Sequence, residues 1–202
     1  RMDVIDLNEY PSFSGLITED VTWEGTIQLT GTVKISDGAV LTIQPGTDIL
    51  VNQNEDIRIW ATDGGQIKAV GTPEDKILFH STGDQQSDWL GIELSGDTNS
   101  FANADGHQNG SEFAYVEINN ASTGISISNQ GLSISNSTFN NNSVGIKLQE
   151  TSNIFVGDSK FSGSGEGIAA DYEDGGKHRD IFLMRNTFDE GNNGINIIPN
   201  QR

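Results

Sequence analysis

The hydrophobic positions of this chain recur in short alternating segments at a nearly constant interval. Five segments carry a Gly-Ile pair, and the isoleucines of the last four recur at intervals of about 21–27 residues. Within a segment, apolar and polar residues alternate, as in Ile125-Ser126-Ile127, which is the period of two expected of a β-strand. Each segment is too short and too rich in Gly, Asn and Ser for a helix. The isoleucines of this first ladder are Ile92, Ile125, Ile146, Ile168 and Ile195.

Two further hydrophobic ladders accompany the last four isoleucines at fixed distances. The second ladder lies seven residues before the first, and the third lies five residues before the second, while the total period drifts. Three strands in a turn of about 21 residues predict a parallel β-helix, whose coils stack about 4.8 Å apart so that like residues lie over like. The second ladder is Ile118, Phe139, Phe161 and Phe188, and the third is Phe113, Ile134, Val156 and Leu183.

The predicted fold class is therefore all-β, a single-stranded parallel β-helix with three strands and about 21–27 residues per coil. We expect it to occupy residues 21–202, with wider coils before residue 113. Among these, Ile43 is expected over Ile67 and Thr47 over Thr72. Residues 1–20 lack the pattern and are expected to form an irregular lead-in or cap. No helix or polar cap follows the last strand, so we expect a truncated or uncapped C-terminal coil, covered by a flanking domain or a partner.

The glycines before the isoleucines, such as Gly124 and Gly145, are expected to mark tight bends that a Cβ would obstruct. Asn140, Asn141 and Asn142 follow Phe139 at an expected corner, because asparagine tolerates left-handed backbone conformations.

The composition and net charge of the chain limit the classes of partner that it can bind. The 29 acidic and 11 basic residues give a net charge of −18, which disfavours nucleic acid and anionic membrane surfaces. No apolar run approaches the roughly 20 residues of a membrane span, so membrane insertion is not expected. The chain has no cysteine, which excludes disulfides and thiolate metal sites. The acidic excess has two interpretations: a solvated surface, or carboxylates that bind calcium.

Several motifs of the chain resemble a known family. The segments VLTIQPGT, GQIKAVGT, ILFHS and WLGIEL, followed by repeats of the form N-S-x-F-x-N-N-S-x-G-I, are similar to the right-handed parallel β-helix repeat proteins of bacteria. The resemblance covers roughly residues 21–200. It implies a right-handed coil of the pectate-lyase-like superfold and a secreted or cell-surface location.

The family's functions leave three hypotheses open. Its members include polysaccharide lyases, alginate epimerases, phage tailspikes and surface proteins, and most of their substrates are polysaccharides. The Asp-Pro-His triplet associated with alginate epimerases and the calcium-binding nonapeptide are both absent from this chain. The leading hypothesis is a non-catalytic module, a scaffold that binds polysaccharide or surface glycan or belongs to an adhesin. The alternatives are an enzyme acting on polysaccharide, of lyase, epimerase or hydrolase type, and a purely structural stalk segment.

Two long insertions are predicted to leave the same edge of the coil, at residues 95–112 and 170–180. Long loops on a rigid scaffold often carry a site, although insertions in solenoids are also commonly solvated decoration. Trp60 alternates out of phase with its isoleucine neighbours, so it is a candidate for stacking on a sugar, with packing as the alternative. His80 lies in a strand segment and is expected to pack. The catalytic candidates are Asp105, His107, His178 and Arg179, and the ligand-binding candidates are Trp60, Asp105, His107 and Tyr172.

The second insertion also holds a candidate calcium site. Asp171, Glu173 and Asp174 supply three carboxylates within four residues, and the glycines that follow allow the backbone to fold around an ion. The alternative is that these carboxylates pair with Lys177 and Arg179. No cofactor is required by any other motif.

Overall fold

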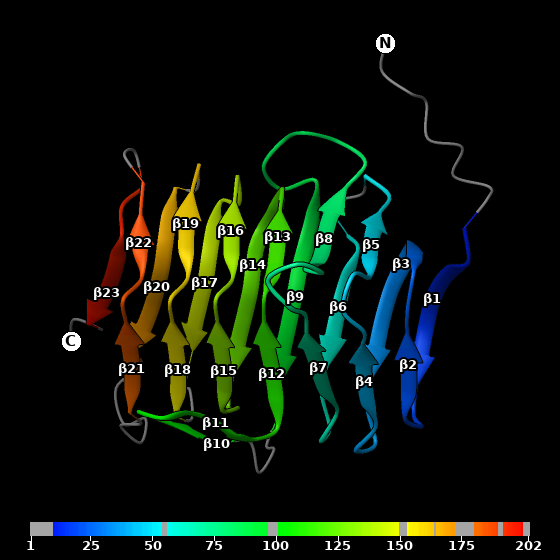
Figure 1. Cartoon of the computed structure of the whole chain (residues 1–202), viewed down its shortest axis with the longest axis horizontal. Helices are drawn as coiled ribbons and strands as arrows, with labels where there is room; N and C mark the ends of the chain where they lie inside the picture. The colour runs from blue at the N-terminus through cyan, green and yellow to red at the C-terminus, as the bar shows by residue number, and fades with distance from the viewer. Residues whose placement is uncertain are drawn as a thin grey trace.

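The protein is described by a computed structural model over residues 10–53, 56–96, 101–149, 153–163, 165–172, 180–189 and 192–199. Every regular element within these ranges is a β-strand. No helix of this part of the chain is long and apolar enough to cross a membrane. Figure 1 shows the strands stacked side by side along the long axis, from the N-terminal to the C-terminal coil.

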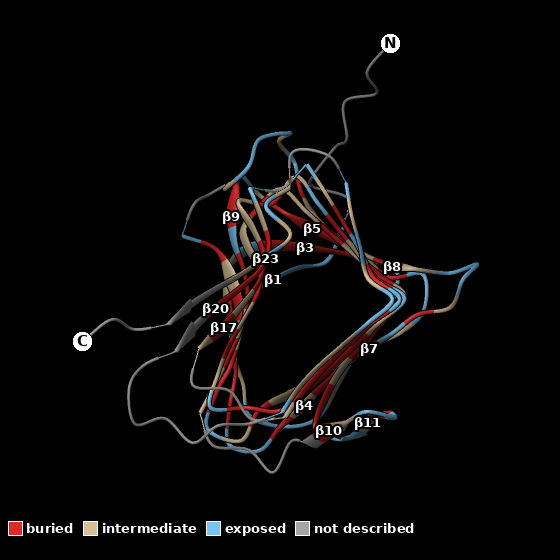
Figure 2. Ribbon diagram, turned by 90° about the vertical axis from the view of Figure 1, so that its left-hand side faces the viewer, coloured by how far each residue is buried: buried red, intermediate tan, exposed pale blue. Residues whose placement is uncertain are grey.

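The strands form a three-sided prism, which is seen from its end in Figure 2. All sheet pairs along its sides are parallel, as the three-strand repeat predicts. A seven-stranded sheet forms the first face, and a 14-stranded sheet forms the second and third faces because β3 (Thr26–Ile35) turns the corner between them.

The first face contains β2 (Val21–Trp23), β4 (Val40–Ile43), β7 (Gln66–Val70), β12 (Ser111–Ala114), β15 (Leu132–Ser135), β18 (Ile154–Gly157) and β21 (Ile181–Met184). The second face contains the first half of β3, then β5 (Asp48–Val51), β8 (Ile77–Ser81), β13 (Val116–Asn119), β16 (Thr138–Asn140), β19 (Lys160–Ser162) and β22 (Thr187–Phe188). The third face contains the second half of β3, then β6 (Arg58–Ala61), β9 (Trp89–Ser95), β14 (Ala121–Ser128), β17 (Val144–Gln149), β20 (Glu166–Tyr172) and β23 (Ile195–Pro199). Strand β1 (Ser12–Ile17) pairs with both halves of β3.

The three predicted ladders are confirmed, because their members are direct partners in neighbouring coils. Ile125, Ile146, Ile168 and Ile195 follow one another in register. The rings of Phe139, Phe161 and Phe188 stack with centroids 5.0 Å apart at both steps. The third ladder, from Phe113 to Leu183, is likewise in register. The core is thus a set of apolar columns that run along the prism axis.

The predicted register of the N-terminal coils was wrong by two residues. Leu41, and not Ile43, pairs with Ile67, and Ile43 pairs with Ala69. A shift of two residues keeps every side chain on its own face of the strand, so the alternating pattern alone does not distinguish the two registers. The coils here are wider, as expected. Ile59 pairs with Ile92, and the interval between these two partners is longer than the expected range for one coil.

The segment expected to be an irregular lead-in contains a strand. Strand β1 pairs with β3, although most of its side chains are exposed and therefore carry no alternating apolar pattern. The ring of Phe13 lies 5.3 Å from that of Trp23, which fills the N-terminal end of the core. β1 therefore adds an edge strand beside β3 at this end of the prism, and the cap expected here stays a prediction.

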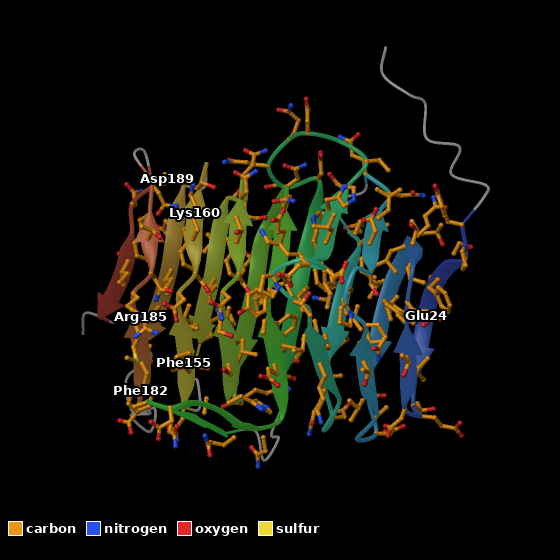
Figure 3. All side chains as sticks on the ribbon, viewed as in Figure 1. Glu24, Phe155, Lys160, Phe182, Arg185 and Asp189 are labelled. Atoms are coloured by element: carbon orange, nitrogen blue, oxygen red, sulfur yellow. The ribbon has the colours of Figure 1, made fainter. Side chains whose placement is uncertain are left out.

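The core becomes more accessible at the C-terminal coil. Ile195 is 45% exposed, whereas Ile168 in the same ladder is 1% exposed. Two exposed ion pairs join this coil to the preceding one: Arg185 to Asp158, and Lys160 to Asp189 at 3.0 Å (Figure 3). Exposed ion pairs add little stability, so they do not replace a cover over the coil. The flanking domain or partner expected to cover this coil stays a prediction.

Four of the five glycines before the isoleucines, namely Gly91, Gly124, Gly145 and Gly167, have no room for a Cβ, as expected, and Gly91 also has a positive φ. A Cβ on Gly124 would lie 2.6 Å from the carbonyl oxygen of Gly145 and 2.8 Å from the ring of Phe139. Neither Gly124 nor Gly145 has a positive φ. These positions lack a side chain because the phenylalanine ladder occupies the space.

Candidate functional site

Trp60 lies on the outer surface of the third face. In β6 the neighbouring Ile59 and Ala61 point into the core, so the alternation of the strand turns the indole outward, where it is half-buried. Trp60 is in register with Lys34 in one neighbouring coil and with Glu93 in the other. These three side chains therefore form a row across the coils.

Charged and hydroxyl groups fix the indole in this row. The Lys34 ammonium lies 5.1 Å from the ring centroid and the Arg58 guanidinium carbon lies 4.7 Å from it, both within the range of cation–π attraction. Arg58 also pairs with Glu93, and the indole N–H donates a 2.7 Å hydrogen bond to Ser95 Oγ. The result is an aromatic ring held among charged and polar groups, which we call the Trp60 patch.

Residues 101–109 form a hairpin on the outside of the first face. Strands β10 (Phe101–Asn103) and β11 (Gly106–Asn109) pair antiparallel and lie against β15 and β18. Phe155 points outward from β18, yet it is 8% exposed, because the hairpin covers it near Gly106. Figure 3 shows Phe155 and Phe182 in successive strands, beside the hairpin.

The hairpin carries two predicted site residues, which have different neighbours. His107 Nδ1 lies 3.3 Å from Glu112 Oε2, and its Nε2 lies 3.3 Å from the Gly110 carbonyl oxygen. Asp105 lies at the turn, where its backbone N–H donates to Asn103 Oδ1. Glu112 was not among the predicted residues, although its position in the outward row of β12 places it at the base of the hairpin.

The predicted site residues do not form one cluster. Trp60 lies on the third face, whereas Asp105 and His107 lie over the first face. Both insertions do connect the third face to the first, from β9 to β12 and from β20 to β21, so they leave the same edge of the prism as predicted.

The remaining candidates lie at the limit of the described residues. The backbone of Asp171 and Tyr172 ends β20, and Glu173, Asp174, His178 and Arg179 lie outside the described ranges. Within those ranges, no three His, Asp or Glu side chains are grouped to hold a metal ion. Calcium binding at Asp171, Glu173 and Asp174 stays a prediction.

The second face carries an imidazole–carboxylate pair between β5 and β8. His80 Nε2 lies 2.7 Å from Asp48 Oδ1. The hydrogen bond to Asp48 raises the pKa of His80 above its ordinary 6.5. Partial burial lowers this pKa, whereas the charge of Asp48 and a backbone hydrogen bond at Ser81 raise it further. His80 thus lies on the outer side of the second face, where its contact with Asp48 joins two coils.

We expect this pair to make the free energy of unfolding depend on pH. Because the folded pKa of His80 is raised, the folded protein holds its proton more tightly than the unfolded chain does. The contribution is complete below the ordinary pKa of 6.5 and is lost as the pH rises through the folded pKa. Urea unfolding between about pH 6 and pH 8 should show stability falling in the wild type and falling less in His80→Gln. If His107→Gln removes the dependence of stability on pH and His80→Gln does not, the pH dependence does not come from His80.

Family models match both halves of this prism. Residues 15–127 match a model described as a pectate-lyase like beta helix domain, and residues 85–202 match one described as a right handed beta helix region. The chain belongs to the right-handed β-helix family. The right-handed β-helix expected from the sequence is thereby confirmed. Neither the curated proteins nor the solved structures gave a match. Membership in the right-handed β-helix family establishes the fold, and the function has to be argued from the site.

Proposed function

We propose that this protein is a secreted or cell-surface module that binds polysaccharide or surface glycan without transforming it. The observation that carries the proposal is the Trp60 patch on the third face. A pyranose ring presents C–H groups on its faces and hydroxyls around its rim. The half-buried indole, with Lys34 and Arg58 over its ring and Glu93 and Ser95 beside it, offers an aromatic group together with charged and hydroxyl groups that can hydrogen-bond to a sugar.

The contacts of His107 support a structural role in the hairpin. Both of its ring nitrogens have partners at the base of the hairpin, namely Glu112 and the Gly110 carbonyl. Phe155 beneath the hairpin is an apolar anchor. His107 therefore holds the hairpin on the sheet. It lies over the first face, whereas Trp60 lies on the third face, so the two side chains do not face the same ligand.

We expect Trp60→Ala to weaken glycan binding at least about tenfold, which corresponds to about 1.4 kcal/mol. The measurement is a glycan array with the full chain, followed by titration calorimetry on the best ligand. Trp60→Phe keeps a flat ring and should retain most of the affinity. Tyr115→Ala removes an aromatic side chain from the corner between β12 and β13, away from Trp60, and serves as the matched control.

Two outcomes would contradict this proposal. If Trp60→Ala and Tyr115→Ala weaken binding equally, the patch is not the binding surface. If the wild type cleaves a uronate polymer, seen as the ultraviolet absorbance of unsaturated uronate, the protein is an enzyme. The description of the first matched family favours that second candidate function.

A further inference from the structure

The connection between β8 and β9 is longer than its counterparts in later coils. Phe79 is in register with Ile118 of the second ladder, and Ile92 belongs to the first. The interval between them is nearly twice the seven residues that separate the two ladders in each coil that follows. The additional residues form the loop 82–88, which we call the strap. It rises above the sheets at the top of Figure 1.

The base of the strap is fixed by the buried carboxylate of Asp88. Its Oδ2 accepts hydrogen bonds from Ser81 Oγ at 2.8 Å and from the Gln85 N–H at 3.1 Å, and its Oδ1 accepts one from Gln53 Nε2 at 2.8 Å. A Cβ on Gly83 would lie 2.3 Å from Asp88 Oδ2, so the strap backbone passes directly over this carboxylate. The base of the strap is therefore anchored to its own coil through Ser81 and to the preceding coil through Gln53, which follows β5.

From this base, the strap reaches the following coils at the corner between the second and third faces. Asn120 Nδ2 donates to the Gly83 carbonyl and Asn141 Nδ2 donates to the Asp84 carbonyl, both at 2.9 Å. The Asn141 amide also donates to Asn120 Oδ1 at 2.8 Å, so the two corners are joined to each other as well.

The tip of the strap extends the contact further. Gln86 Nε2 donates to the Gly163 carbonyl at 2.7 Å, and Ser87 Oγ lies 2.9 Å from Ser143 Oγ. The Gln86 contact spans 77 residues of sequence. The strap thus touches three successive coils beyond its own, at the corners that follow β13, β16 and β19.

This arrangement departs from the ordinary energetics of a solenoid. In a repeat protein each repeat contacts only its neighbours, so coils can open one after another from an end. A loop that hydrogen-bonds to three coils adds contacts between coils that do not touch through their strands. Opening the coil of β19 and β20 then also requires losing a contact to the coil of β8 and β9.

We propose that the strap is a clamp that makes the coils from β8 to β20 open as one cooperative unit. The coil of β21, β22 and β23 lies beyond its reach and opens independently of it. Ile195, which is far more exposed than the rest of its ladder, belongs to this outer coil.

The test compares two strap variants by hydrogen exchange and mass spectrometry on the full chain. Gln86→Ala with Ser87→Ala removes the two contacts at the tip. Gln85→Ala is the matched control, because the Gln85 side chain hydrogen-bonds to Asp84 within the strap itself and its backbone N–H to Asp88 is retained. Asp88→Ala, which releases the base, is a second variant that should also speed exchange in β16, β17, β19 and β20, together with exchange near Gln53, whose side chain loses its acceptor.

We expect amides of β16, β17, β19 and β20 to exchange about tenfold faster in the tip variant, since two hydrogen bonds of ordinary strength are lost. Exchange in β4, β5 and β23 should be unchanged, and so should exchange throughout the Gln85→Ala control. A change confined to residues 82–88, or an equal change in the control, would overturn the clamp. Exchange tests coupling between coils and does not depend on glycan binding.

Discussion

Replacing Phe161 by alanine is expected to lower the free energy of unfolding by about 3–5 kcal/mol. The side chain is fully buried, and its ring lies between those of Phe139 and Phe188 at 5.0 Å from each centroid. The interplanar angles of 7° and 13° show that the three rings form one column, so removal of the middle ring leaves a cavity with stacked neighbours on both sides. Chemical denaturation followed by circular dichroism measures the change.

Phe182→Ala is the matched control for this prediction. Phe182 also belongs to the C-terminal half, but it lies on the outer face of β21 and is only half-buried. Its replacement should cost clearly less than that of Phe161. A cost below about 1 kcal/mol for Phe161→Ala would contradict a closely packed interior column.

The sequence predicted the C-terminal half of the fold well because its ladders have constant spacing. The interval of seven residues between the phenylalanine and isoleucine ladders requires a strand, a corner and a second strand of fixed length. Only one arrangement then brings Phe161 over Phe139. In the N-terminal coils the intervals vary, and an alternating strand can slide by two residues without exposing its core side chains. That ambiguity caused the wrong pairing of Ile43.

The candidate site was predicted less completely because its contacts cross between coils. Exposure of Trp60 followed from alternation within β6. Its cation neighbour Lys34 comes from another coil, through a register that the sequence did not define. Glu112 could have been found from its outward position next to Phe113. The strap had a visible signal in the long interval between Phe79 and Ile92, but the targets of a loop cannot be inferred from its length.

The tight spacing of the ladders also explains why the third face carries a glycine in each of several coils, and Gly145→Ala tests this directly. A Cβ at Gly145 would lie 2.5 Å from the Gly167 carbonyl oxygen and 2.7 Å from Cδ1 of Phe161. One of these atoms belongs to the backbone of the next coil and the other to a ring fixed in the column, so neither moves without cost. We expect destabilisation of about 3 kcal/mol, at the upper end of the usual cost of overpacking.

The control and a double variant separate this steric cause from a general effect of replacing glycine. Gly165→Ala changes a nearby glycine whose added Cβ would meet its nearest atom, the Ser143 carbonyl oxygen, at 3.1 Å, and it should cost less. In the Phe161→Ala background the ring is gone, so Gly145→Ala should be less destabilising there than in the wild type. Strictly additive effects of the two substitutions would show that the glycine does not make room for the ring, and that the isoleucine and phenylalanine columns are not sterically coupled.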